Sequence, residues 1–119
     1  MLLVCYPKCG TCAKARAWLD ANKLEYEWRD IRDDNPTAAE IAIWQRASGL
    51  PLKKFFNTSG LKYKELGLSK KLPELSEDEQ LKLLATDGML VRRPLLIDGT
   101  TVLVGFKEAE WAARLRKED

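Results

Sequence analysis

The spacing between apolar residues changes twice across residues 2–31, and this succession limits the chain to few folds. Residues 2–6 (LLVCY) form a short apolar run ended by Pro7, which is typical of a buried strand. From Cys9 onward apolar residues recur with helical spacing, and residues 24–31 (LEYEWRDI) alternate apolar and charged side chains as a strand does. A strand, a helix and a strand at this spacing predict a βαβ unit with parallel strands and a right-handed crossover.

A mainly helical stretch follows, from about residue 36 to residue 88 (36–88). A helix is expected from Thr37 to about Ser48. Its apolar side is expected to comprise Ile41, Ile43, Trp44 and Ala47. Shorter helical pieces come next, and Ser76 with Glu79 three residues later predicts a capping box that starts another helix. The sequence thus predicts a helical insertion of about fifty residues after the βαβ unit.

Two short strands and a final helix complete the pattern. Residues 94–98 (PLLID) and 101–105 (TVLVG) are separated by Asp98–Gly99–Thr100, a hairpin turn signal, and a helix is expected over residues 107–116. A βαβ half followed by a ββα half predicts an α/β, thioredoxin-like fold: a four-stranded mixed sheet flanked by helices, with the helical insertion between the halves. The length suits one domain spanning residues 1–119.

Histidine is absent from the 119 residues, which excludes histidine general catalysis, Cys–His nucleophile pairs and every histidine-containing metal site. The 20 Lys and Arg residues nearly balance the 18 Asp and Glu residues, so no concentrated basic face for nucleic acid is expected. No apolar run approaches the roughly 18 residues that span a bilayer, and the start lacks the features of a signal peptide. We therefore expect a cytoplasmic protein with no direct nucleic-acid or membrane partner.

Three cysteines fall within eight residues, at Cys5, Cys9 and Cys12. The C-x3-C-x2-C spacing matches the iron–sulfur fingerprint of radical-SAM enzymes, but those enzymes need a much longer α/β barrel. A zinc site would lack an identified fourth ligand, because the chain offers three thiolates and no histidine. The remaining interpretations are a redox-active dithiol of Cys9 and Cys12, with Cys5 in the core, or three small core residues without chemistry.

The position of the C-x-x-C pair at a helix start favours the redox interpretation. There the first sulfur faces backbone N–H groups and the positive end of the helix dipole, so Cys9 is the expected nucleophile. Cys12 points inward and suits the resolving role. The residues beside Cys9 are candidates for substrate binding: Lys8, which adds positive charge, Gly10, which leaves the turn open, and Thr11.

Arg93–Pro94 stands directly before the third expected strand. Thioredoxin-like folds hold a cis-proline against the active dithiol at this place, and such a bond lets the preceding backbone face a substrate. A proline that merely starts a strand is the alternative. Arg93 and Pro94 are therefore further candidates for substrate binding.

At this point the sequence resembles the arsenate reductase (ArsC) family, which includes the Spx transcription regulators. The resemblance rests on four segments: YPKCGTCAKARAWL, YKELGL, DGMLVRRPLLID and LVGFKE. It implies that Cys9 is the catalytic cysteine. Cys12 falls where glutathione- and glutaredoxin-dependent reductases carry serine and Spx-type members carry cysteine. Arg93 matches one oxyanion-binding arginine, while Asn57 and Gly105 stand where the family has two others.

The missing arginines bear on the substrate, because guanidinium groups are suited to holding a tetrahedral oxyanion bidentately. Lys53 or Lys54, close to Asn57 in the sequence, could supply a substitute charge. A reductase acting on disulfides or small thiol adducts needs no arginine triad.

Two functions are therefore expected, besides a redox-inert member of the fold. The first is a thiol–disulfide reductase acting on a small thiol or oxyanion substrate, with Cys9 attacking and Cys12 resolving. Glutathione, glutaredoxin or thioredoxin would recycle it, and no metal or bound cofactor is implied. The alternative is a Spx-like regulator that binds RNA polymerase and uses the Cys9–Cys12 pair as a switch.

Overall fold

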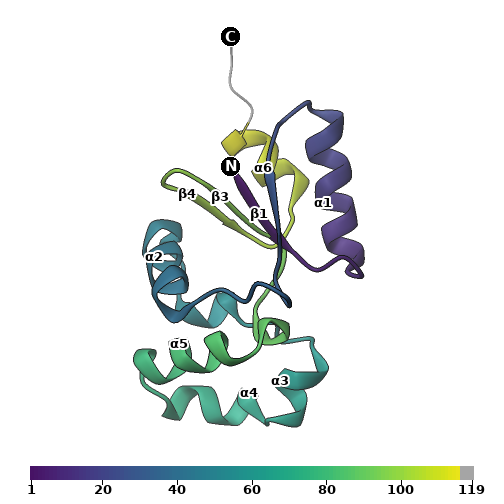
Figure 1. Cartoon of the computed structure of the whole chain (residues 1–119). Coiled ribbons are helices and arrows are strands. Elements are labelled where there is room, and N and C mark those ends of the chain that lie inside the picture. The colour runs from purple at the N-terminus through teal and green to yellow at the C-terminus, as the bar shows by residue number, and fades with distance from the viewer. Residues whose placement is uncertain (116–119) are drawn as a thin grey trace.

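The computed structural model describes residues 1–115 of the chain, and Figure 1 shows their arrangement. The strands are β1 (Leu2–Cys5), β2 (Glu27–Asp30), β3 (Leu95–Asp98) and β4 (Thr101–Val104). The α-helices are α1 (Gly10–Ala21), α2 (Ala38–Ser48), α3 (Leu61–Glu65), α4 (Leu68–Lys71), α5 (Glu77–Thr86) and α6 (Glu108–Leu115). Three 3₁₀ helices complete the elements: η1 (Leu52–Phe55), η2 (Leu72–Glu74) and η3 (Gly88–Leu90).

The strands form one mixed sheet in the order β2-β1-β3-β4. β1 and β2 are parallel, with Leu3 opposite Trp28, whereas β1–β3 and β3–β4 are antiparallel. The predicted βαβ and ββα halves are thus confirmed, and β1 and β3 join them at the centre of the sheet.

Alternate residues of the central strands enter two separate cores, because successive side chains of a strand point to opposite faces. Leu3 and Cys5 of β1 pack with α1 and α6 in a cluster that contains Cys12 and Trp111. Val4 packs in the other cluster, with side chains of α2, α5 and the short helices between β2 and β3. We call these the thiol face and the insertion face of the sheet.

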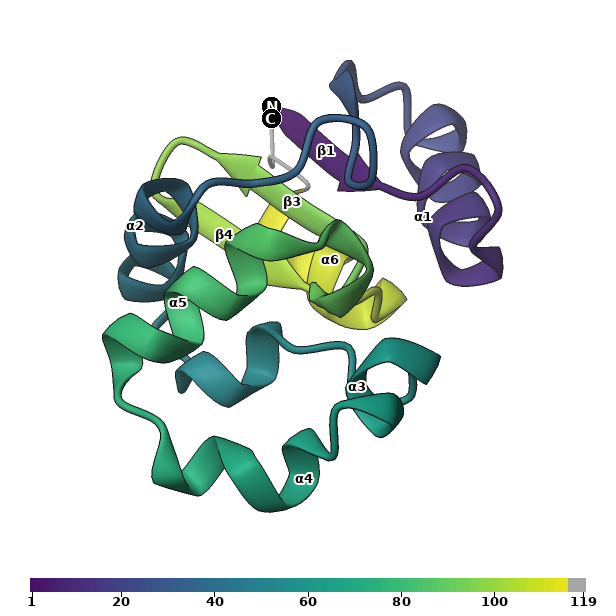
Figure 2. The same cartoon turned by 60° about the horizontal axis from the view of Figure 1, so that its bottom comes forward.

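The insertion folds from strong local signals. Ser76 and Glu79 form the predicted capping box of α5, and Thr37 and Glu40 form a second one at α2. In Figures 1 and 2 α3 and α4 lie away from the strands and from α1, whereas Leu84 of α5 packs in the same cluster as Val4. Long-range contacts close this segment at its base. The N–H of Arg92 donates to the carbonyl of Phe55 at 2.8 Å, and that of Asn57 to the carbonyl of Leu90 at 2.8 Å.

Two expectations about these elements were wrong. Ile43 is 64% exposed and Ala47 is also exposed, so the buried side of α2 is Ile41 and Trp44. At about 100° per residue, positions two and six beyond Ile41 lie about 200° and about 240° around the helix, away from the core. The second strand is also shorter than residues 24–31, because β2 lies at the sheet edge and pairs only with four-residue β1.

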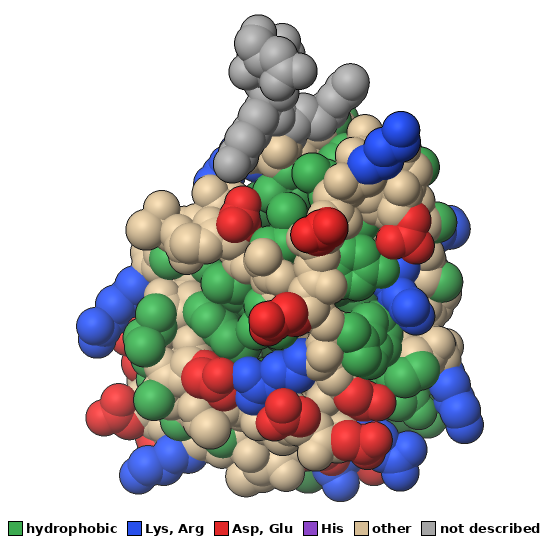
Figure 3. Space-filling view, turned by 45° about the horizontal axis from the view of Figure 1, so that its top comes forward, with side chains coloured by type: hydrophobic (Ala, Val, Ile, Leu, Met, Phe, Trp, Pro, Cys, Tyr) green, Lys and Arg blue, Asp and Glu red, His purple; other side chains and the backbone are tan. Residues whose placement is uncertain are grey.

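Acidic and basic side chains are interspersed on the surface shown in Figure 3, as the near balance of charges predicts. Of the helices in the described residues, none combines the length and the apolar character needed to cross a membrane.

Candidate active site around Cys9

Cys9 is the N-cap residue of α1, with extended backbone angles (φ −91°, ψ 124°). Its N–H donates to the carbonyl of Tyr6 at 3.0 Å, and its own carbonyl accepts from the N–H of Ala13 at 3.0 Å. Within residues 1–115 its sulfur makes no capping hydrogen bond to the helix. The half-buried thiol is therefore presented to a cavity at the start of a twelve-residue helix, as the C-x-x-C spacing predicts.

Cys12 and Cys5 lie behind Cys9 in the thiol face, 1% and 0% exposed. The Cys12 sulfur accepts from the N–H of Tyr6 at 3.4 Å. A hydrogen bond from the Cys5 thiol is the main cause that lowers the pKa of Cys12 to about 7, against the opposing effect of burial. The same hydrogen bond, together with burial, raises the pKa of Cys5. Cys5 is thus a core residue, as expected, but one in contact with the dithiol.

All three thiols are free in the structure. No group of three Cys, Asp or Glu side chains in the described part of the chain converges as metal ligands would.

The cavity in front of Cys9 has a volume of about 290 Å³. Three separate segments enclose it together with the start of α1: the loop after η1, the residues before β3, and the residues after β4. Its lining residues are Cys9, Thr11, Phe56, Asn57, Thr58, Ser59, Arg92, Arg93, Gly105 and Phe106. The insertion and the two sheet halves therefore all contribute to the site.

Arg93 is held in place from several sides. Its Nη1 donates to the carbonyls of Met89 and Val91, both at 3.2 Å, and its guanidinium lies 5.6 Å from the centre of the Tyr6 ring. With the amide oxygen of Asn57 turned toward it, that oxygen accepts from Nη1 and Nη2 at 3.3 and 3.2 Å. Arg93 is thus a rigid positive wall of the cavity.

The structure brings together only part of the set of candidate residues. Cys9, Thr11 and Arg93 line the cavity, and Cys12 lies directly behind it. The Arg93–Pro94 peptide bond is cis, and Pro94 is buried, with its carbonyl accepting from the N–H of Gly105 at 2.8 Å. Lys8 and Gly10 are exposed and are not among the lining residues.

Arg92 is a site residue that the sequence reasoning missed. Its guanidinium lies over Gly105, where a Cβ atom would come within 2.9 Å of Nε and 3.0 Å of Nη2. Both ion pairs found in the described residues belong to Arg29, so Arg92 has no carboxylate partner there. The Arg-Arg-Pro run was the available signal. Extending the β3–β4 register by one pair places Pro94 opposite Gly105, and the Arg92 side chain reaches over that glycine.

The lysines considered as substitute charges lie elsewhere. Lys54 lines a second cavity and Lys53 a third, and neither is among the lining residues of the Cys9 cavity. The second guanidinium in front of Cys9 is that of Arg92.

Comparison with known proteins is consistent with this geometry. The model of a family described as the ArsC family matches residues 5–114. A solved structure of an ArsC family related protein from Bacteroides fragilis is 57% identical, with a TM-score of 0.92 and 94% of each chain covered. A structure described as a possible arsenate reductase from Streptococcus mutans UA159 is 48% identical, with a TM-score of 0.83, covering 89% of this chain and 90% of the other.

Two curated relatives are similar to the chain over most of its length. The uncharacterized protein YusI of Bacillus subtilis (strain 168) is 55% identical, over 89% of this chain and 90% of its own length. The global transcriptional regulator Spx 1 of Bacillus anthracis is 30% identical, over 87% of this chain and 78% of its own. The similar proteins thus include one described as a possible arsenate reductase and one named as a transcriptional regulator.

Proposed function

The chain belongs to the ArsC family, and from that premise we propose that it is a thiol–disulfide reductase acting on small thiol adducts. One observation carries the proposal. A half-exposed thiol, Cys9, faces a cavity with two guanidinium groups, and a buried second thiol, Cys12, lies behind it with its pKa lowered to about 7. This is the arrangement that a nucleophile and a resolving thiol require.

The proposed cycle has two exchange steps. The Cys9 thiolate attacks one sulfur of a disulfide R–S–S–R′, and R′–S⁻ leaves and takes up a proton. Cys12 as thiolate then attacks the Cys9 sulfur of the mixed disulfide and releases R–S⁻, which leaves a Cys9–Cys12 disulfide. Two electrons from an external thiol reductant, such as glutathione, glutaredoxin or thioredoxin, restore the two cysteines. No step needs a metal or a bound cofactor.

The cavity favours an anionic substrate. Arg92 and Arg93 place two guanidinium groups around the space in front of Cys9, and Asn57 supplies a neutral hydrogen-bonding group. Arg93 already donates to two backbone carbonyls, so Arg92 is the guanidinium with more donors available to a ligand. We propose that disulfides and thiol adducts carrying a carboxylate are preferred over arsenate, because only Arg93 remains of the family's three arginines.

The test is the midpoint potential of the Cys9–Cys12 bond, measured in thiol–disulfide buffers with the bond mapped by mass spectrometry. A reversible disulfide between roughly −180 and −270 mV is expected, the range of working dithiol catalysts and carriers. Cys9→Ser should abolish disulfide reduction, and Cys12→Ser should trap the mixed disulfide on Cys9. Full turnover by Cys9→Ser would exclude the mechanism.

The similarity to Spx 1 and the presence of Cys12 favour one second candidate, a redox-switched regulator that binds RNA polymerase. In that case the disulfide alters a binding surface and completes no catalytic cycle. A pull-down of RNA polymerase subunits with reduced and with oxidised protein separates the two, since retention dependent on redox state is expected only of the regulator.

A further inference from the structure

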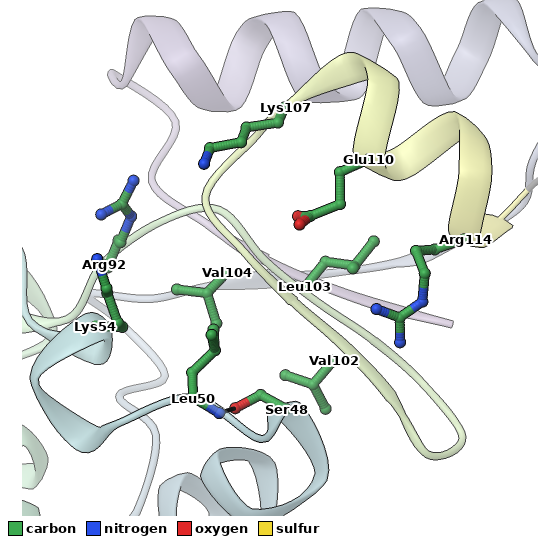
Figure 4. Close-up of a pocket in the computed structure, with 10 residues that line it drawn as sticks. All are labelled: Ser48, Leu50, Lys54, Arg92, Val102, Leu103, Val104, Lys107, Glu110 and Arg114. Atoms are coloured by element: carbon green, nitrogen blue, oxygen red, sulfur yellow. Dashed lines mark hydrogen bonds between the residues drawn. The ribbon is translucent and has the colours of Figure 1, made fainter.

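A second cavity, of about 310 Å³, lies at the outer edge of β4 (Figure 4). β4 is the last strand of the sheet, and the cavity opens between α6 and the end of α2, with Leu103 and Val104 at its base. Leu103 belongs to the thiol face and Val104 packs on the insertion face, so the cavity straddles the sheet edge. We call it the β4-edge cavity.

Its lining is rich in positive charge. Lys107 precedes α6 and Arg114 projects from it, Lys54 and Arg92 lie on the opposite side, and Glu110 is the single carboxylate among the lining residues (Figure 4). The only ion pairs among residues 1–115 are those of Arg29, so none of these five groups is paired with another within 4.0 Å. Four cations without an ion-pair partner among residues 1–115, around one concave apolar base, form a surface suited to carboxylates.

Arg92 belongs to both cavities: it lines the Cys9 cavity and the β4-edge cavity. Its guanidinium lies over Gly105, where any side chain would displace it, so the glycine leaves room for the arginine between the two sites. The two cavities therefore share the Arg92 side chain, and a ligand that occupied both would have to pass it.

We propose that the β4-edge cavity binds the carboxylate-bearing end of a low-molecular-weight, amino-acid-derived thiol whose sulfur reacts at Cys9. This inference rests on the proposed reductase function and specifies its substrate class. In this arrangement Lys54, Arg92 and Lys107 bind carboxylate groups. Glu110 accepts a hydrogen bond from an ammonium group, and Leu103 and Val104 contact the aliphatic part. An inorganic oxyanion would occupy only the Cys9 cavity and would make no use of α6.

The chain offers a matched pair of charge reversals for the test. Lys53 and Lys54 are neighbours in η1 and both exposed, but only Lys54 lines the β4-edge cavity. Reduction rates are measured for oxidised glutathione, which carries carboxylates and ammonium groups, and for the neutral bis(2-hydroxyethyl) disulfide. Wild type is compared with Lys54→Glu, Lys107→Glu and the control Lys53→Glu.

We expect Lys54→Glu and Lys107→Glu each to lower kcat/KM for oxidised glutathione by about tenfold, equivalent to about 1.4 kcal/mol. For the neutral disulfide, both variants should keep kcat/KM within about twofold of wild type. Lys53→Glu should keep kcat/KM within about twofold for both substrates. An equal loss on both disulfides, or no loss on either, overturns the proposal.

A binding measurement keeps this result separate from failure of the reductase function. If wild type reduces neither disulfide, the reductase proposal fails. Ligand binding to the β4-edge cavity is then measured by titrating reduced glutathione into the Cys9→Ser variant and recording amide NMR shifts. Shifts at Leu103, Val104 and Lys107 that disappear in Lys107→Glu support the subsite. Their absence overturns it.

Discussion

The two faces of the sheet are built in different ways and contribute different parts of the site. The thiol face is packed by two helices, α1 and α6, and holds Cys5 and Cys12 behind Cys9. The insertion face is packed by α2, α5 and the shorter helices between β2 and β3, and an isolated β-bridge between Phe56 and Val91 closes the segment between these two residues. The proposed nucleophile, Cys9, and its partner thiol therefore belong to one packed unit, while the guanidinium groups and Asn57 are positioned by the other.

This difference separates the chemistry from substrate recognition. Substitutions in the buried thiol face should change stability and thiol reactivity, whereas substitutions in the insertion or at the exposed residues around α6 should change which substrate binds. For example, the hydrogen bonds from Arg93 to the carbonyls of Met89 and Val91, at the end of the insertion, hold the guanidinium of Arg93 in the cavity in front of Cys9.

The largest effect on stability is expected from Trp111→Ala, which tests how much the packing of α6 stabilises the thiol face. Trp111 is 0% exposed, makes edge contacts with Phe106 and Trp18, and donates from Nε1 to the carbonyl of Gly105 at 3.1 Å. Its removal should lower the free energy of unfolding by about 3–5 kcal/mol, measured by urea denaturation.

The matched control is Trp111→Phe, which keeps an aromatic ring but loses the hydrogen bond to Gly105. It should cost about 1–2 kcal/mol. Equal urea midpoints for wild type and Trp111→Ala would show that α6 does not stabilise this face.

An intermediate effect is expected from Cys5→Ala, within the thiol face itself. The Cys5 thiol is the main cause of the lowered pKa of Cys12, so its removal should raise that pKa above about 7. The rate at which the Cys9–Cys12 bond closes is measured from the release of thionitrobenzoate, which Cys12 displaces from labelled Cys9. In wild type the rate should fall as pH drops below about 7, because Cys12 becomes protonated. In Cys5→Ala this fall should begin at a higher pH, with a several-fold slower rate near neutrality. Identical pH profiles would assign the thiolate character of Cys12 to other contacts.

The smallest effect is expected at the pair that joins the two regions, Arg29 of β2 and Glu40 of α2. Arg29 donates to both carboxylate oxygens of Glu40, at 2.6 and 2.8 Å, and this lowers the pKa of Glu40 to about 2. Glu40→Gln should cost about 1 kcal/mol at neutral pH, a modest amount because the carboxylate is partly exposed to solvent.

The pH dependence follows from the direction of the shift. A carboxylate with a lowered pKa stabilises the folded state above its unfolded value near 4.5, and this contribution disappears as pH falls toward 2. Urea denaturation of wild type and Glu40→Gln should therefore converge between those two pH values. A constant difference down to pH 2 would mean that the ion pair does not cause the effect.

The same two regions differ in how far the sequence predicts them. In the thiol face, local periodicity gives β1, α1 and the β3–β4 hairpin, and the C-x-x-C spacing gives the position of Cys9 and the burial of Cys12. In the insertion, the helices were foreseen but the buried side of α2 was not, because Ile43 and Ala47 are apolar yet face away from the core.

The composition of the site depends on contacts between distant segments. Asn57 meets Arg93 because residues 55–57 pair with residues 90–92, a closure that no local pattern reveals. The space above Gly105 is filled by Arg92, which lies thirteen residues earlier. Matching each position to a family residue showed that an arginine was absent at 105, but it did not show that another arginine occupies the same region.

The start of α1 has a consequence for the evolution of position 9. Helices α2 and α5 each begin with a hydroxyl that caps the first turn, whereas α1 begins with a thiol that caps nothing within residues 1–115. A serine at position 9 would supply the missing cap and stabilise the helix by about 1 kcal/mol. Selection for stability alone would therefore replace the proposed nucleophile by serine. If the proposed function is right, a cysteine persists at this position only while its reactivity is under selection.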